Sequence, residues 1–153
     1  MAAKSFEFRL ITPQGKLLDS VVSSVAIPAH DGSMGQLPNH AAFVVKLGLG
    51  ELRINFAPDP RAAPGSNQGG SRAYLVEDGF AQMVDNRLTV LTTRAIPVEQ
   101  LTESDAQAEL NKAEAAKPEN TSLSAATALR RDRDRARLKL RLALARARAG
   151  KGI

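Results

Sequence analysis

The stretch FAQMVDNRLTVLT, residues 80–92, decides the fold class predicted for residues 1–95. Two apolar-rich segments, Phe80–Val84 and Leu88–Thr92, flank the pair Asp85-Asn86. Asp and Asn tolerate the left-handed backbone conformation that a tight turn requires. Two short apolar segments joined by such a pair predict a β-hairpin.

Further strands are predicted on the N-terminal side of this hairpin. Phe6, Phe8 and Leu10 alternate with polar residues, which is the period of two expected for a strand with one buried face. Other short apolar segments lie at residues 17–27, 43–47, 52–56 and 72–76. Together they make about eight strands at a spacing of roughly ten residues, a pattern typical of a sandwich or barrel.

A Pro- and Gly-rich segment interrupts these strands at residues 58–71. It contains three Pro and three Gly, so it does not fit the interior of a strand. We expect it to form a long, mobile hairpin loop. Its flanks, residues 52–56 and 72–76, would then pair with each other.

Residues 96–153 predict helices in place of strands. Thr102 is followed three residues later by Asp105, which is typical of a helix N-terminus. Residues 103–116 contain no Gly and no β-branched side chain, and residues 122–149 are dominated by Ala, Leu and Arg. The chain is therefore predicted to be an all-β N-terminal domain followed by a C-terminal helical hairpin whose second helix is about twice as long as the first.

The positive charge of the chain is concentrated in its last segment. Residues 130–153 hold eight Arg and two Lys against two Asp, whereas the net charge of the whole chain is only +5. The rest of the chain is therefore mildly acidic. This distribution is typical of a terminal interaction segment and not of a uniformly basic binding protein.

The basic helix leaves several interpretations open. Its leucines alternate, so that Leu138 and Leu142 lie near one side of a helix while Leu140 and Leu144 lie almost opposite. A helix with this pattern is suited to being held by a larger partner, and the alternative is a solvated, partly frayed helix. Its arginines can neutralise phosphates or a carboxylate-rich protein surface. They are Arg130, Arg131, Arg133, Arg135, Arg137, Arg141, Arg146 and Arg148. A nucleic-acid-binding module using residues 130–148 is therefore the alternative function.

The sequence gives little support for a self-contained active site. It has no Cys, no Trp and two His, so thiol chemistry is excluded and imidazole chemistry has few candidates. His30, Asp31 and His40 lie in or beside one turn-rich segment without an evident fourth metal ligand, and we interpret them as polar loop residues. We expect no catalytic residue, no metal and no cofactor. No apolar run is long enough to span a membrane, and no secretory signal is predicted.

Two segments resemble the epsilon subunit of bacterial F-type ATP synthases. Residues 26–41, AIPAHDGSMGQLPNHA, are similar to that family's loop A-P-x-x-D-G-x-x-G-x-L-P-x-H-A. Residues 76–91, with Gly79-Phe80, Asn86 and Leu88-Thr-Val-Leu91, resemble its G-G-F-x-x-V-x-x-N-x-V-T-I-L signature. The resemblance is specific over residues 6–95 and architectural beyond residue 100.

The resemblance implies a rotor (central-stalk) subunit that links the gamma subunit to the c-ring and couples proton flow to ATP synthesis. Residues 1–95 would be a ten-stranded rotor-binding sandwich. Candidate contacts to the c-ring or gamma are Asp31, Gly32, Ser33, Met34 and His40. The complex would place the chain, peripherally, at the cytoplasmic face of the bacterial plasma membrane.

The resemblance also implies that residues 96–153 regulate the enzyme. In that family the helical hairpin either folds against the sandwich or extends along gamma to the catalytic alpha and beta subunits, where it blocks ATP hydrolysis. Candidate contacts to gamma or beta are Arg130, Arg131, Arg133, Arg135, Arg137, Leu138, Arg141, Leu142 and Arg146.

A nucleotide-binding motif found in some members is not matched here. That motif reads I-D-x-x-R-A, and the corresponding residues are Leu101, Thr102, Asp105 and Ala106. The Asp of the motif is replaced by Thr102 and its Arg by Asp105, which reverses the charge that would face a phosphate. We therefore expect the free subunit not to bind ATP.

Overall fold

The computed structural model describes residues 4–58, 69–118 and 121–150 of the chain. The predicted loop at residues 58–71 lies largely outside these described residues. The chain divides into two compact units, residues 1–96 and residues 97–153. Each unit is described below by itself.

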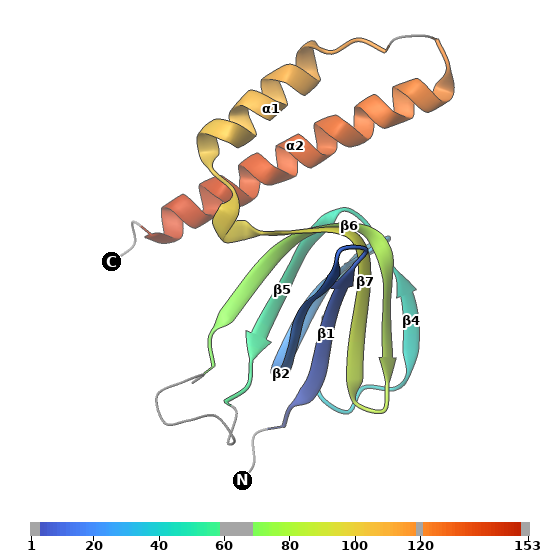
Figure 1. Cartoon of the computed structure of the whole chain (residues 1–153), viewed down its shortest axis with the longest axis vertical. Helices are drawn as coiled ribbons and strands as arrows, with labels where there is room; N and C mark the ends of the chain where they lie inside the picture. Colours follow the sequence, from blue (N-terminus) through green and yellow to red (C-terminus); the bar gives the residue numbers. More distant parts are fainter. Residues whose placement is uncertain (1–3, 59–68, 119–120, 151–153) are drawn as a thin grey trace. The chain divides into compact units, whose positions relative to one another are not determined.

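The first unit is a seven-stranded β structure over its described residues (Figure 1). Its strands are β1 (Phe6–Thr12), β2 (Gly15–Ala29), β3 (Gly32–Gln36), β4 (Phe43–Lys46), β5 (Gly50–Phe56), β6 (Ser71–Val84) and β7 (Arg87–Pro97). The strand order is β1-β7-β6-β5-β2-β3, and β1 also pairs with β2. The ladder therefore closes into a ring through β1, with β3 beside β2 and β4 beside β6. The pairing of β1 with β7 is parallel, whereas β1 and β2 run antiparallel.

The described residues form seven strands in place of the expected ten, and part of the difference arises because two strands are long and change partners along their length. β2 pairs with β1 over its first half and with β3 and β5 over its second half. β6 pairs with β5 from Ser71 to Val76 and with β4 from Phe80 to Met83. Asp78 and Gly79, between these two halves, have positive φ values of 56° and 120°. The predicted pairing of residues 52–56 with 72–76 is confirmed.

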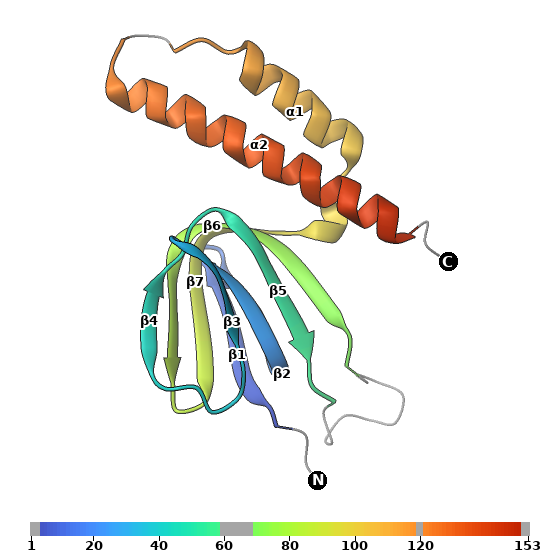
Figure 2. The same cartoon turned by 180° about the vertical axis from the view of Figure 1, so that it is seen from behind.

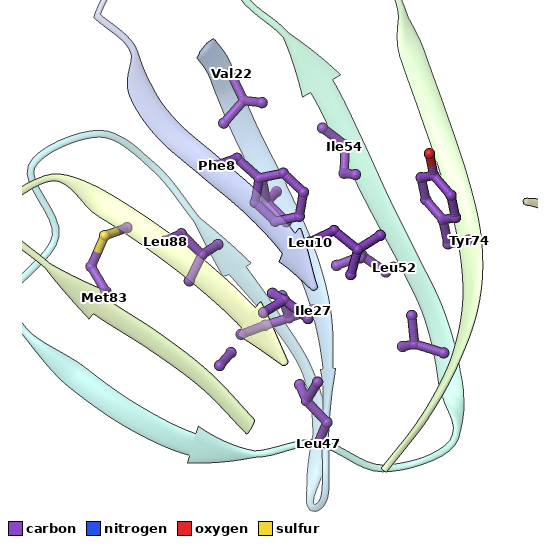
Figure 3. Close-up of a cluster of buried hydrophobic side chains, with 14 of the residues drawn as sticks. Phe8, Leu10, Val22, Ile27, Leu47, Leu52, Ile54, Tyr74, Met83 and Leu88 are labelled. Carbon is purple, nitrogen blue, oxygen red and sulfur yellow. The ribbon is translucent and has the colours of Figure 1, made fainter. Parts of the chain in front are cut away.

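The interior of the ring holds one apolar cluster (Figure 3). Phe6, Phe8 and Leu10 point into it from β1, as their alternation predicts, and none is more than 2% exposed. The other strands contribute aliphatic side chains together with Tyr74 and Met83. Since all members of the cluster lie between residues 6 and 90, the first unit contains its own hydrophobic core.

The second unit is a helical hairpin in which α1 and α2 lie side by side (Figures 1 and 2). A short 3-10 turn, η1 (Val98–Gln100), precedes α1 (Glu103–Ala115), and α2 covers Leu123–Gly150. Thr102 caps α1 as predicted, because its hydroxyl accepts a hydrogen bond from the backbone N–H of Asp105 at 3.3 Å. An all-β sandwich followed by a helical hairpin is therefore confirmed.

Candidate functional site

Four of the five predicted contact residues gather at the tip of the β2–β3 hairpin. Register pairs Ala29 with Gly32 and Ile27 with Met34, so the tight turn consists of His30 and Asp31. Asp31, Gly32 and Ser33 are exposed, and Met34 is 37% exposed. Gly32 has a φ of +146°, a conformation that favours glycine at the end of this turn. The tip presents small, polar side chains and accessible backbone.

Backbone hydrogen bonds hold the hairpin tip against β4. The N–H of His30 donates to the carbonyl of Lys46 at 2.8 Å, and the N–H of Gly48 donates to the carbonyl of Pro28 at 2.9 Å. A β-bridge also joins Ala29 to Leu47. Because these contacts involve the last residues of β2 and His30 of the turn, the tip projects from a fixed base.

His40 lies away from this tip. β3 separates the two, and its five residues extend about 14 Å at the rise of a β-strand. The neighbouring Asn39 has a φ of +62°, and its N–H donates to the Asn86 side-chain oxygen at 2.9 Å. The Asn86 amide in turn donates to the carbonyl of Ser5 at 3.0 Å. Asn86 thus ties the segment carrying His40 to the β6–β7 turn and to the start of β1.

Replacing Asn86 tests this junction. Asn86→Ala removes both side-chain hydrogen bonds and places an alanine at a φ of 59°. We expect the free energy of unfolding to fall by about 2–3 kcal/mol, from the lost hydrogen bonds and the left-handed backbone. Asn86→Gly loses the same hydrogen bonds but does not have the backbone penalty. Its free energy of unfolding should therefore fall by only about 1–2 kcal/mol. Urea unfolding measures both, and equal losses for the two variants would contradict the backbone contribution.

The outer face of the first unit carries an apolar band that sequence reasoning missed. Val44 on β4 is 69% exposed, Phe80 and Val84 on β6 are 53% and 41% exposed, and Leu91 on β7 is 49% exposed. We call these four residues the apolar band. Val44 pairs with Gln82, which lies between Phe80 and Val84 on the outward positions of β6, while Ala81 and Met83 point into the core. The sequence carries only a partial signal, since Phe80 and Val84 are apolar on the outward set while Gln82 between them is polar.

Exposed ion pairs lie on the outer side of β1 and on its neighbours β2 and β7. Arg87 donates a hydrogen bond to Glu7, which raises the pKa of Arg87 above its usual value. Lys16 donates to Asp19 at 2.8 Å and lowers the pKa of that carboxyl, with a smaller contribution from Arg9 at 3.4 Å. Such exposed pairs contribute little to stability. They make the outer side of β1 and its neighbours polar.

Several predicted contact residues of α2 are engaged within the hairpin. Arg133 donates to the backbone carbonyls of Ala113 and Ala116 at 3.0 and 3.1 Å. Arg146 donates to the carbonyl of Glu99 at 2.6 Å. Ion pairs also join Arg135 to Asp132, Arg137 to Glu114, and Lys139 to Glu109. Arg131 also has a partner.

Four arginines, among them the Arg137 just described, form one exposed row along α2. Arg130, Arg137, Arg141 and Arg148 are spaced i, i+7, i+11 and i+18, which places them on one side of the helix over about 27 Å. We call these residues the outer arginine row. All are exposed, and Arg137 makes a weak contact of 3.5 Å to Glu114. Leu138 and Leu142 lie on a different side and are buried.

The positions that correspond to a nucleotide-binding motif have structural roles. Leu101 and Ala106 are buried, and the Thr102 hydroxyl donates to the Asp105 carboxylate at 2.6 Å. Thr102 and Asp105 therefore satisfy each other at the start of α1. Within the described residues, no three His, Cys, Asp or Glu side chains form a cluster able to hold a metal ion. No described helix is both long and apolar enough to cross a membrane.

Comparisons of sequence point to one family. The model of the family described as "ATP synthase, Delta/Epsilon chain, beta-sandwich domain" matches residues 5–98. The ATP synthase epsilon chain of Granulibacter bethesdensis is 36% identical over 131 residues, covering 82% of this chain and 88% of the relative. That of Rhodopirellula baltica is 34% identical over 124 residues, covering 79% and 88% respectively.

Comparisons of structure agree at the level of the fold. A chain in the mitochondrial ATP synthase of Euglena gracilis, in a structure of its OSCP, F1 and c-ring, matches 92% of this chain. The TM-score is 0.65, the identity is 20%, and 78% of that chain is covered. A chain from the central stalk and c-ring of the Tetrahymena thermophila enzyme matches 94% of this chain with a TM-score of 0.60 and 16% identity, and 99% of that chain is covered.

Proposed function

Since this chain belongs to the ATP synthase delta/epsilon family, we propose that it works in the central stalk of a proton-translocating ATP synthase, where it joins a gamma subunit to a c-ring. It is a non-catalytic subunit, and its residues serve assembly, coupling and regulation. As part of the complex it is associated with a membrane. The alternative of a nucleic-acid-binding module has no support in the comparisons.

The apolar band is the observation that carries this function. Exposed apolar groups that share one face of a sheet are typical of a protein–protein interface. Phe80 provides the large side chain that most often dominates binding energy at such a surface. The band therefore binds gamma, and the first unit attaches the chain to the rotor.

Co-purification with the gamma subunit of the same cell tests this attachment. A complex that survives moderate salt is expected, because apolar contacts are screened far less than ionic ones. Phe80→Asp should weaken binding at least tenfold, as expected for a central aromatic at an interface. Titration of labelled chain with gamma measures the affinity.

The matched control makes the same chemical change elsewhere. Leu123, on α2, is 84% exposed and lies outside the apolar band. Leu123→Asp should leave the affinity for gamma within about twofold, because single exposed apolar residues outside an interface contribute little. Equal affinities for the parent chain and Phe80→Asp would contradict the assignment of the band to gamma.

The hairpin tip and His40 are the contacts proposed for the c-ring and for gamma beside it. The small side chains of Gly32 and Ser33 allow close backbone approach to a polar loop of another subunit. Asp31, Met34 and His40 supply exposed side chains for the same purpose. Because β3 separates His40 from the tip, these residues form two contact areas and not one.

The second unit acts as a brake on ATP hydrolysis. The outer arginine row is accessible to an acidic surface of the alpha and beta subunits. Leu138 and Leu142 are only 8% and 5% exposed, so they contact gamma only when the hairpin rearranges. Each arrangement is then stabilised by different contacts, and the balance between them sets the rate. The remaining arginines, Arg131, Arg133, Arg135 and Arg146, join that surface after the same rearrangement.

Two further properties follow from the family and the residues. The free chain does not bind ATP, because the positions of the nucleotide motif cap α1 instead. In a bacterium the subunit lies at the cytoplasmic face of the plasma membrane, held there only by the complex.

A further inference from the structure

The C-terminal end of α1 lacks the usual means of closing a helix. The last carbonyls of any helix have no partner within it and need another donor. A glycine in the left-handed conformation commonly closes the turn, but Ala116 at this position has a φ of −68° and a ψ of 138°. Its N–H satisfies only the carbonyl of Lys112.

Arg133 supplies the missing donors from the middle of α2. Its Nε donates to the carbonyl of Ala113 at 3.0 Å, and its Nη2 donates to that of Ala116 at 3.1 Å. The carbonyl of Glu114 lies 3.5 Å from the same Nη2. The positive guanidinium also lies at the negative end of the α1 dipole. One half-buried side chain thus caps α1 and fastens it to α2.

The contribution of α1 to apolar packing is limited. Ala106 is the one fully buried side chain among the residues of α1, and an alanine buries little apolar surface. The ion pair between Arg137 and Glu114 is exposed, so it adds little. Polar ties add to this packing: Lys139, whose side chain is 13% exposed, pairs with Glu109 at 2.7 Å, and Arg133 makes the largest set, with three carbonyls within 3.5 Å.

We propose that Arg133 is the latch of the hairpin: its guanidinium holds α1 against α2, and its withdrawal lets the helices separate while each stays helical. The planar fork of the guanidinium is required, because an ammonium group cannot reach carbonyls on both sides in the same geometry. The latch itself is independent of the partners of the chain. Its consequence for ATP hydrolysis rests on the function proposed above.

The distance between α1 and α2 tests the latch in the full-length chain. The chain has no Cys, so Ala108→Cys and Ala145→Cys can be labelled without removing other thiols. Both positions are exposed, one on each helix. Double electron–electron resonance then gives the distance distribution between the two spin labels.

We expect Arg133→Ala to raise the fraction of separated helices about tenfold, the factor expected for loss of a charged hydrogen-bonding group. Arg133→Lys should raise it nearly as much, although the charge is kept. Arg130→Ala is the control, because it removes the same charge one turn earlier on α2 from a side chain of the outer arginine row. Its distance distribution should equal that of the parent chain.

Three results would overturn the latch. These are an Arg133→Ala distribution equal to that of Arg130→Ala, an Arg133→Lys distribution equal to that of the parent, and a loss of helical circular dichroism that accounts for the separation. ATP hydrolysis by the assembled complex is measured separately. A changed distance with unchanged hydrolysis would support the latch and contradict the brake.

Discussion

Removing residues 98–153 is expected to raise ATP hydrolysis by the assembled complex about fivefold or more, within the range of regulatory coupling between sites. The first unit keeps its whole core in this variant, because the buried cluster lies within residues 6–90. Binding to gamma should therefore be unchanged. The steady-state rate of ATP hydrolysis, measured on complexes with equal subunit content, gives the result.

A second variant identifies which side of α2 is responsible. Replacing the four residues of the outer arginine row by Gln removes the charge and keeps the helix, because Gln is a good helix former. If the row contacts an acidic surface, this variant should reproduce most of the increase, and more strongly at low salt than at high salt. The proposed brake is wrong if hydrolysis by the truncated complex equals that of the parent.

Gly79→Ala is expected to lower the free energy of unfolding of the first unit by about 3 kcal/mol or more. A Cβ at this position would lie 1.9 Å from the carbonyl oxygen of Leu91 and 2.8 Å from the Cα of Thr92. Both are backbone atoms of β7, so the strand itself must move. The φ of +120° adds strain for any residue with a side chain. Urea unfolding should show a lower midpoint with an unchanged slope.

Gly35→Ala is the control for this variant. Gly35 lies on β3 and has no atom within 4 Å of an added Cβ, and its φ is not positive. The free energy of unfolding of Gly35→Ala should stay within about 0.5 kcal/mol of that of the parent, as for other surface substitutions. Similar losses for the two variants would show that the close approach between β6 and β7 has no special cost.

Most strands and both helices could be predicted because local patterns specify them, whereas β3, with the sequence GSMGQ, has no such pattern. The alternation of Phe6, Phe8 and Leu10 identifies a buried face without knowledge of its partners. The turn at Asp85 and Asn86 follows from residues that accept positive φ, and both have it. The number of strands could not be predicted, because a long strand that changes partners looks like two short ones in sequence.

The surfaces were harder to predict because they depend on tertiary placement. From the sequence alone, the arginines of α2 cannot be told apart by role. The position of α1 divides them into those that tie the hairpin together, such as Arg133 and Arg146, and an exposed row. The exposure of Phe80 depends likewise on which side of β6 meets the core. Neither distinction is present in local spacing.

The closed strand ring has a mechanical consequence for a part that turns with a rotor. In an open sheet, a twisting load peels strands away one at a time from the free edge. Here the parallel pairing of β1 with β7 and its antiparallel pairing with β2 close the ladder, so no strand of the ring ends at an edge. A twisting load on the first unit is therefore shared in shear by many hydrogen bonds at once, and the closed ring resists it as one stiff body.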